Sequence, residues 1–265
     1  MRSVRLIGLP TDVNSSFLRG PAAAPRHIRA ALFSDMGNLA TERGAELVAD
    51  IPIEDAGDLP LDETAADDAR IEDAVRSACA DGAVPILLGG DHAVTYPVLR
   101  GIAAVHGPVN ILHFDAHPDL YDELGGNRRS HASPFARIME EGLAARLVQV
   151  GIRTLNTHQR EQARRFGVEI VSMRDFAASS VPVPPGPLYV SIDLDGLDPA
   201  CAPGVSHHEP GGLTVRQLLD VLARVEGGLV GADVVELNPD RDINGMTAAV
   251  AAKLVKELCG LAHRP

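Results

Sequence analysis

The sequence contains no tryptophan, few aromatic side chains of any kind and only three cysteines. Aromatic residues make up 3% of the 265 residues, so the hydrophobic core must be built mainly from Ala, Val, Leu and Ile. Cys79, Cys201 and Cys259 are too few and too scattered for a disulfide framework or a thiolate metal site. This usage is typical of a compartment in which thiols stay reduced, and we expect a cytoplasmic protein.

Long apolar runs and an excess of positive charge are also missing. No run reaches the ~20 residues of a membrane-spanning helix, and the apolar stretch at 4–9 is too short for a signal sequence. The chain carries 24 basic and 36 acidic residues, a net charge of −12. Because nucleic acids and anionic membranes attract basic surfaces, we expect neither as a partner. The charge suits a small cationic substrate.

What the chain does contain is a large apolar fraction in alternating segments. Hydrophobic residues make up 45% of the sequence, enough for one large domain spanning residues 1–265. Strand-like segments lie near 4–9, 84–88, 109–115, 146–151, 168–172, 188–194 and 230–237. Helix-like segments lie near 22–33, 65–80, 93–105, 134–141, 157–166, 214–225 and 246–259. This alternation predicts a three-layer α/β/α fold with a mainly parallel central sheet.

Three short runs place two histidines and, besides Asp91 and Asp198, four aspartates at close spacing. They are Gly-Gly-Asp-His at 89–92, Phe-Asp-Ala-His-Pro-Asp at 114–119 and Ser-Ile-Asp-Leu-Asp-Gly-Leu-Asp-Pro at 191–199. Each run ends or follows a predicted strand, and alternate side chains of a strand share one face, so these groups can converge at one sheet edge. Four carboxylates and two imidazoles suit a pair of divalent cations and balance their charge. The runs therefore predict metal-assisted hydrolysis.

Together with further stretches, the three runs resemble the ureohydrolase (arginase/agmatinase) superfamily over nearly the whole chain, and most of all its plant-type arginases. The further stretches are 14–21, 131–140, 149–153, 202–207 and 234–239. Two differences stand out. We expect no transit-peptide extension like that of the plant proteins, and Ala93 follows the histidine where Ser is common. The resemblance implies an arginase-like sheet of eight strands and a closed homo-oligomer, a trimer or a hexamer.

The resemblance also implies a dimanganese centre, with two Mn²⁺ per subunit. Its ligands would be His92, Asp115, His117, Asp119, Asp193 and Asp195. Asp119 also resembles the carboxylate that accepts a proton from the metal-bridging hydroxide. His131 stands where the family has a histidine near the leaving group, and Glu236 stands where it has an acid that pairs with the guanidinium. The implied catalytic residues are thus Asp119, His131 and Glu236, and the implied reaction cleaves a guanidino group to urea and an amine.

The loop before His131 bears on the choice of substrate. Asn127, Arg128 and Arg129 offer donors that would suit the α-carboxylate of L-arginine, which is favoured and would give ornithine. The alternative is that the two arginines face solvent or pair with acids of a neighbouring subunit. Agmatine, which lacks the carboxylate, and other guanidino acids such as guanidinobutyrate stay open as substrates. The expected substrate-binding residues are Asn127, Ser130, His131 and Glu236.

Several other polar residues near the runs have structural interpretations. We expect His113 and Asp91 to support neighbouring ligands rather than to bind a cation themselves. His207, His208 and Glu209 look like a metal cluster, but adjacent side chains point apart. We therefore place them in a long loop at the rim of the site.

Two other functional classes are compatible with parts of the pattern. A dimetal phosphoesterase also uses an Asp-x-His pair, but it normally adds later Gly-Asn-His-Asp and Gly-His-x-His runs, which this sequence lacks. A non-catalytic member of the fold would be expected to have lost ligands, whereas this chain keeps the full set. Both classes are therefore disfavoured against a hydrolase.

Overall fold

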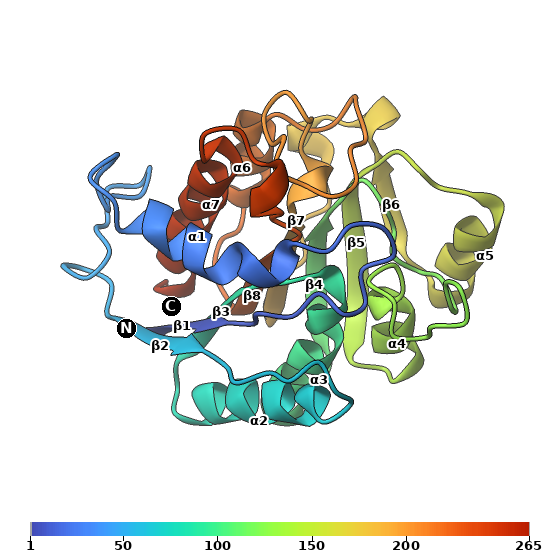
Figure 1. Cartoon of the computed structure of the whole chain (residues 1–265), viewed down its shortest axis with the longest axis horizontal. Coiled ribbons are helices and arrows are strands. Elements are labelled where there is room, and N and C mark those ends of the chain that lie inside the picture. The colour runs from blue at the N-terminus through green and yellow to red at the C-terminus, as the bar shows by residue number, and fades with distance from the viewer. Residues whose placement is uncertain (1, 265) are drawn as a thin grey trace.

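An eight-stranded parallel sheet forms the centre of the molecule, with helices on both of its faces (Figure 1). The computed structural model describes residues 2–264, so the two ends of the expected 1–265 domain lie outside the described residues. The strand order is β2-β1-β3-β8-β7-β4-β5-β6. The strands are β1 (Val4–Gly8), β2 (Ile53–Asp58), β3 (Val84–Leu88), β4 (Val109–Phe114), β5 (Ala144–Ile152), β6 (Glu169–Ser172), β7 (Leu188–Asp193) and β8 (Leu229–Val235). The predicted three-layer α/β/α architecture is confirmed.

The hydrophobic core has two layers, one on each face of the sheet, and helices cover both layers. The helices are α1 (Ala24–Leu32), α2 (Asp67–Ala80), α3 (Thr95–His106), α4 (Pro134–Glu140), α5 (Thr157–Phe166), α6 (Val215–Leu222) and α7 (Met246–Ala262). Helices α1, α6 and α7 cover one face, and α2 to α5 cover the other (Figure 1). Among residues 2–264, no helix combines the length and the apolar character needed to cross a membrane.

Strand β2 was not indicated by the hydrophobic pattern, and its place in the sheet explains why. Its sequence, Ile-Glu-Asp-Ala-Gly-Asp, is mostly polar and exposed. The strand lies at the edge of the sheet and pairs only with β1, so few of its side chains need to be apolar. Arg29 of α1 pairs with Asp55 and Asp58 and ties this edge to the helix layer.

The four central strands bring the three sequence runs to one edge. Strands β3, β8, β7 and β4 are neighbours and all run in the same direction. The runs at 89–92, 114–119 and 191–199 end or follow β3, β4 and β7, and Glu236 directly follows β8. Because the carboxyl ends of parallel strands meet at one edge, residues far apart in sequence converge there.

Two glycines allow the chain to reach this edge without a clash. A Cβ on Gly90 would lie 1.7 Å from the carbonyl oxygen of Thr11, and one on Gly89 would lie 2.4 Å from Cγ1 of Val235. The backbone N–H of Asp91 donates to the carbonyl of Thr11 at 3.0 Å. Backbone therefore packs against backbone just before His92, in space that no side chain can share.

We expect Gly90→Ala to lower the free energy of unfolding by about 1–3 kcal/mol, because the added methyl must displace the backbone at Thr11. Gly37→Ala is the matched control, since a Cβ there meets no atom within 4 Å. Urea denaturation of both variants measures the difference. Equal stability of the two variants would show that the close approach at Gly90 is not a packing constraint.

Candidate active site

A buried imidazole faces three carboxylates at the end of β3. His92 Nδ1 lies 3.2 Å from Asp115 Oδ2, 3.1 Å from Asp119 Oδ2 and 3.1 Å from Asp193 Oδ2. Within residues 2–264 this nitrogen has no hydrogen-bond partner. A polar atom that is buried, unpartnered and surrounded by acids is the arrangement expected for a ligand of a shared cation.

The opposite side of this ring fixes which nitrogen carries the proton. Ser191 Oγ donates its only proton to Asp233 Oδ1 at 2.7 Å, so the Nε2–H of His92 must be the donor in the 3.0 Å contact with Ser191 Oγ. Asp233 is itself held by the hydroxyls of Thr95 and Tyr189, each at 2.7 Å. The Nδ1 lone pair of His92 is therefore directed at the carboxylates, as a metal ligand requires.

A second imidazole, that of His117, lies at a second candidate position for a cation, next to the first. His117 Nδ1 lies 3.4 Å from Asp115 Oδ1 and 3.1 Å from Asp195 Oδ2. Asp115 thus presents one oxygen to each imidazole and lies between the two positions. Among the described residues, two groups of side chains have ligand atoms close enough to hold an ion, one of His92, His113 and Asp115 and one of Asp115, His117 and Asp195. The structure brings all six predicted ligands together around these two positions.

Four carboxylates at this depth repel one another unless cations are bound. Burial, followed by the carboxylates of Asp195 and Asp115, raises the pKa of Asp193 well above its ordinary value. Burial also raises the pKa of Asp195 to about 6. Two divalent ions would relieve this repulsion, and carboxylate and imidazole are ligands that such ions accept. The residues present therefore fit a binuclear divalent-metal site.

His113 and Asp91 lie beside the ligands, as expected from the sequence. His113 Nε2 is 2.9 Å from Asp115 Oδ2, and its ring packs on Phe135 with 4.0 Å between centroids. Asp91 Oδ2 accepts a hydrogen bond from the backbone N–H of Asn14 at 2.9 Å. One residue thus orients a ligand, and the other holds an N-terminal loop next to the site.

His131 and Glu236 form a buried ion pair beside the six ligands. His131 Nδ1 lies 2.8 Å from Glu236 Oε1, and its Nε2 lies 2.8 Å from Ser16 Oγ. Burial disfavours charge on both groups, but their mutual attraction outweighs it. The pKa of His131 is raised to about 9, and that of Glu236 is lowered. Glu236 Oε1 also accepts a hydrogen bond from the backbone N–H of His92 at 2.9 Å, which couples the pair to the ligand cluster.

Two of the candidate residues have left-handed backbone conformations. The φ angle is 49° at Asp119 and 65° at Glu236. Such angles are uncommon for residues with a Cβ, cost on the order of 1–3 kcal/mol and cluster at functional sites. Both occur just beyond a strand end, where the chain turns and carries a carboxylate to the cluster.

A cavity of about 210 Å³ opens onto the ligands and the ion pair. It is lined by Ser16, His117, Asp119, Tyr121, Leu124, His131, Ala132, Thr154, Gln159, Asp193, Asp195, His207, Glu209 and Glu236. The ring of His207 lies 5.1 Å from that of His131, centroid to centroid. His208 instead bonds the carbonyl of Pro203 at 2.7 Å. The long loop after β7 therefore forms part of the cavity wall, as expected.

The two arginines of the expected substrate loop are engaged by acids of the same chain. Arg129 contacts Asp68 through two nitrogens, at 2.8 and 2.6 Å. Arg128 contacts Asp122 at 2.7 Å and Glu140 at 3.1 Å. Neither guanidinium lines the cavity. The idea that they meet a substrate carboxylate is therefore corrected, and they act as structural ion pairs within the subunit.

Asn127 and Ser130 lie in a recess next to the cavity. The recess shares Ser16 and Leu124 with the cavity wall. Asn127 Nδ2 donates to Asn14 Oδ1 at 3.1 Å, and Ser130 is buried. The sequence did not indicate Ser16, Ser191 or Asp233. An aspartate inside an apolar strand is the one signal by which Asp233 could have been found.

We expect Asp193→Asn to reduce bound metal from about two ions per chain to one or fewer, because the amide keeps the volume of the side chain but loses its charge. Elemental analysis of the purified protein measures this. Asp220→Asn is the control, since Asp220 is exposed on α6. Equal metal content in the two variants would remove Asp193 from the set of ligands.

Similar sequences and a similar fold occur in other proteins. The sequence model of the arginase family matches residues 2–260. Mitochondrial arginase 1 of Arabidopsis thaliana is 50% identical, in an alignment covering 97% of this chain and 80% of that protein. The structure of arginase from Medicago truncatula aligns with a TM-score of 0.90 at 45% identity, covering 97% of this chain and 86% of that one. Mitochondrial agmatinase of Gallus gallus is 36% identical, covering 95% and 78%.

These relatives overturn one expectation and confirm another. The expected cytoplasmic location is contradicted, because the similar arginase of Arabidopsis thaliana is named as mitochondrial. Few cysteines indicate only that thiols stay reduced, which does not single out the cytoplasm. The predicted resemblance is confirmed by the family match and by 50% identity over nearly the whole chain. The chain belongs to the arginase family of metal-dependent amidinohydrolases.

Proposed function

We propose that this chain hydrolyses L-arginine to urea and ornithine at a centre of two Mn²⁺ ions. The observation that carries the proposal is the buried pair of Glu236 and His131, which borders the same cavity as four of the metal-ligand candidates, His117, Asp119, Asp193 and Asp195. A guanidinium is planar and cationic, and a fixed carboxylate can bind it through paired charge-assisted hydrogen bonds. Glu236 is the acid in the cavity wall that His131 already holds in its charged form.

Positioning of the substrate follows from where Glu236 is held. Its Oε1 is fixed by the backbone of His92 and by the ring of His131. A guanidinium bound by this acid would place its central carbon over the ligand cluster, which removes much of the entropic cost of bringing reactants together. We therefore assign Glu236 the role of substrate binding and orientation.

Proton transfer falls to two side chains of the cavity wall. When bound, two divalent ions lower the pKa of water from ~16 to roughly 7, which supplies a nucleophile at neutral pH. Asp119, whose carboxylate faces the cluster, takes up the proton that the attacking water gives up. Burial lowers the pKa of His131, but the charge of Glu236 outweighs this and raises the pKa to about 9, so His131 carries a proton near neutrality. It would deliver a proton to the amine, which must leave protonated.

Similarity favours arginine, and the cavity lining leaves agmatine as a second candidate. The chain is 50% identical to a plant arginase and 36% identical to an agmatinase. However, no Lys or Arg is among the described residues that line the cavity, and this suits a substrate without a carboxylate. For arginine, we propose that Asn127 and Ser130, in the adjoining recess, bind the carboxylate end.

We also propose that residues 1–265 act as one domain and that the chain assembles into a closed homo-oligomer, a trimer or a hexamer. Sedimentation of the metal-loaded protein measures the assembly directly. A monomer that is fully active would contradict this part of the proposal.

Urea release from L-arginine and agmatine, assayed side by side on Mn²⁺-loaded protein, tests the choice of substrate. We expect kcat/KM for arginine to exceed that for agmatine by roughly tenfold or more, the worth of one charged hydrogen bond. Asn127→Ala should raise KM for arginine and leave KM for agmatine unchanged. A preference for agmatine, unaffected by Asn127→Ala, would replace arginine with agmatine as the substrate.

His131→Ala should lower kcat by roughly a hundredfold or more, because proton transfer to the leaving amine is lost. Metal content should not change, since His131 is not among the ligand candidates. His106→Ala is the control, because His106 is an exposed residue at the end of α3. Full turnover by the His131 variant would exclude it from catalysis.

A further inference from the structure

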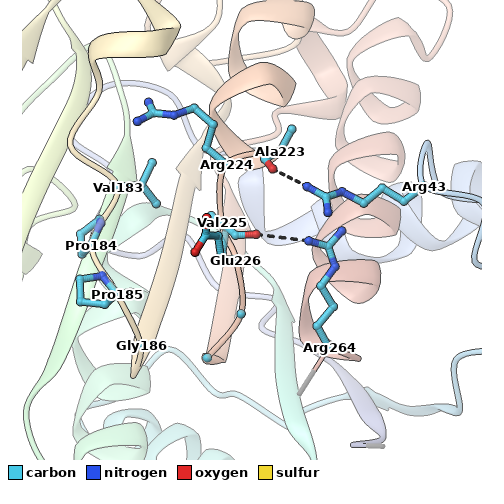
Figure 2. A pocket seen from close by; sticks show the side chains of 12 residues that line it. Arg43, Val183, Pro184, Pro185, Gly186, Ala223, Arg224, Val225, Glu226 and Arg264 are labelled. Atoms are coloured by element: carbon cyan, nitrogen blue, oxygen red, sulfur yellow. Dashed lines mark hydrogen bonds between the residues drawn. The ribbon is translucent and has the colours of Figure 1, made fainter.

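A second cavity, of about 1030 Å³, lies at the edge of the sheet opposite the candidate active site. Figure 2 shows the side chains that line it. It is formed by the segments 183–186 and 223–228, which precede β7 and β8, together with Arg43 and Arg264. Strand β7 runs from Leu188 to Asp193. At about 3.3 Å per residue, the strand separates the two sites by roughly 17 Å. The cavity is therefore distinct from the metal cluster.

Two guanidinium groups meet at one side of this cavity. Arg43 donates a hydrogen bond to the carbonyl oxygen of Ala223, and Arg264 donates to that of Val225 at 3.3 Å. Figure 2 shows the two guanidinium groups next to each other. Burial and the nearby charge of Arg43 lower the pKa of Arg264. The two cations thus repel each other at close range.

A third arginine lies across the cavity from this pair. Arg224 points to the other side in Figure 2 and donates to the carbonyl oxygens of Ala178 and Val181, at 2.6 and 2.7 Å. One acid, Glu226, also lines the cavity and is exposed. The local charge is therefore positive, in a chain whose net charge is −12.

These arginines differ from many others because, among the described residues, no carboxylate lies within ion-pair distance of them, although the charge of Glu257 acts on Arg264. Within residues 2–264, Arg43, Arg224 and Arg264 form no ion pair, whereas Arg29 and Arg129 each contact at least one carboxylate. Arg43 and Arg264 each donate one hydrogen bond to a carbonyl that follows α6, and Arg224 donates two, to the carbonyls of Ala178 and Val181. A guanidinium has five N–H donors, so most of the donors around the cavity are left for another partner.

We propose that this cavity binds a small organic anion with two negatively charged groups. The adjoining forks of Arg43 and Arg264 suit one carboxylate or phosphate group, which guanidinium binds in a bidentate manner. Arg224 then takes the second charged group on the far side. Pro184 and Pro185 provide an apolar wall for the carbon skeleton between the two.

Calorimetric titration of the full-length, metal-loaded protein tests the proposal with two probes, succinate and glycerol 2-phosphate. The first carries two carboxylates and the second a phosphate, so their relative affinities identify the anionic group. We expect saturable binding of at least one probe. Combined Arg43→Gln and Arg264→Gln substitution should weaken that binding roughly tenfold or more. The control variant Arg164→Gln, at an exposed arginine of α5, should bind the probes as the wild type does. Any binding of a probe to the metal ions is then the same in the control and in the wild type.

A second variant guards against a trivial loss through misfolding. Glu226→Gln should strengthen binding, because it removes the one acid that competes with the anion. No binding of either probe would overturn the proposal, and so would equal affinity of the wild type and the double arginine variant. If sedimentation shows instead that the double variant loses an assembly while neither probe binds, the face is a contact between copies and the proposal is wrong.

Discussion

The mutual repulsion of four buried carboxylates is the constraint on which the rest of this structure depends. Asp115, Asp119, Asp193 and Asp195 are delivered to one place by the ends of β4 and β7, and burial makes their shared negative charge costly. Two bound cations would relieve this repulsion. The buried network behind His92 and the glycines before it serve the same end, because they hold an imidazole lone pair against those acids.

The parallel sheet explains why residues from distant segments meet at this point. Strands β3 and β4 are consecutive in the chain but are separated in the sheet by β8 and β7. The ligand candidates and the pair formed by His131 and Glu236 therefore lie together at the carboxyl edge, where four of the ligands and both members of the pair line one cavity. The opposite edge carries a separate cluster of arginines. The strands thus keep a cation-binding end and a cationic end apart in one domain.

The sequence predicted those elements and side-chain positions that depend on one local physical effect. It did not predict those that depend on several effects or on tertiary structure. Apolar strands that end in alternating aspartates predicted β4, β7 and their ligands, because spacing alone determines which side chains share a face. β2 was missed because an edge strand needs few apolar residues. The ion pair of Arg129 with Asp68 joins residues 61 positions apart, and the bond of Ser16 to His131 joins residues 115 positions apart. Pairings of this kind depend on tertiary structure, and no local pattern predicts them.

The six ligand candidates would hold two cations, one beside His92 and one beside His117. Anomalous X-ray diffraction from crystals of the Mn²⁺-loaded protein, measured at the manganese absorption edge, tests this arrangement most directly. We expect two peaks, one next to His92 Nδ1 and one next to His117 Nδ1, with the Asp115 carboxylate between them. A single peak, or peaks away from these two nitrogens, would contradict it.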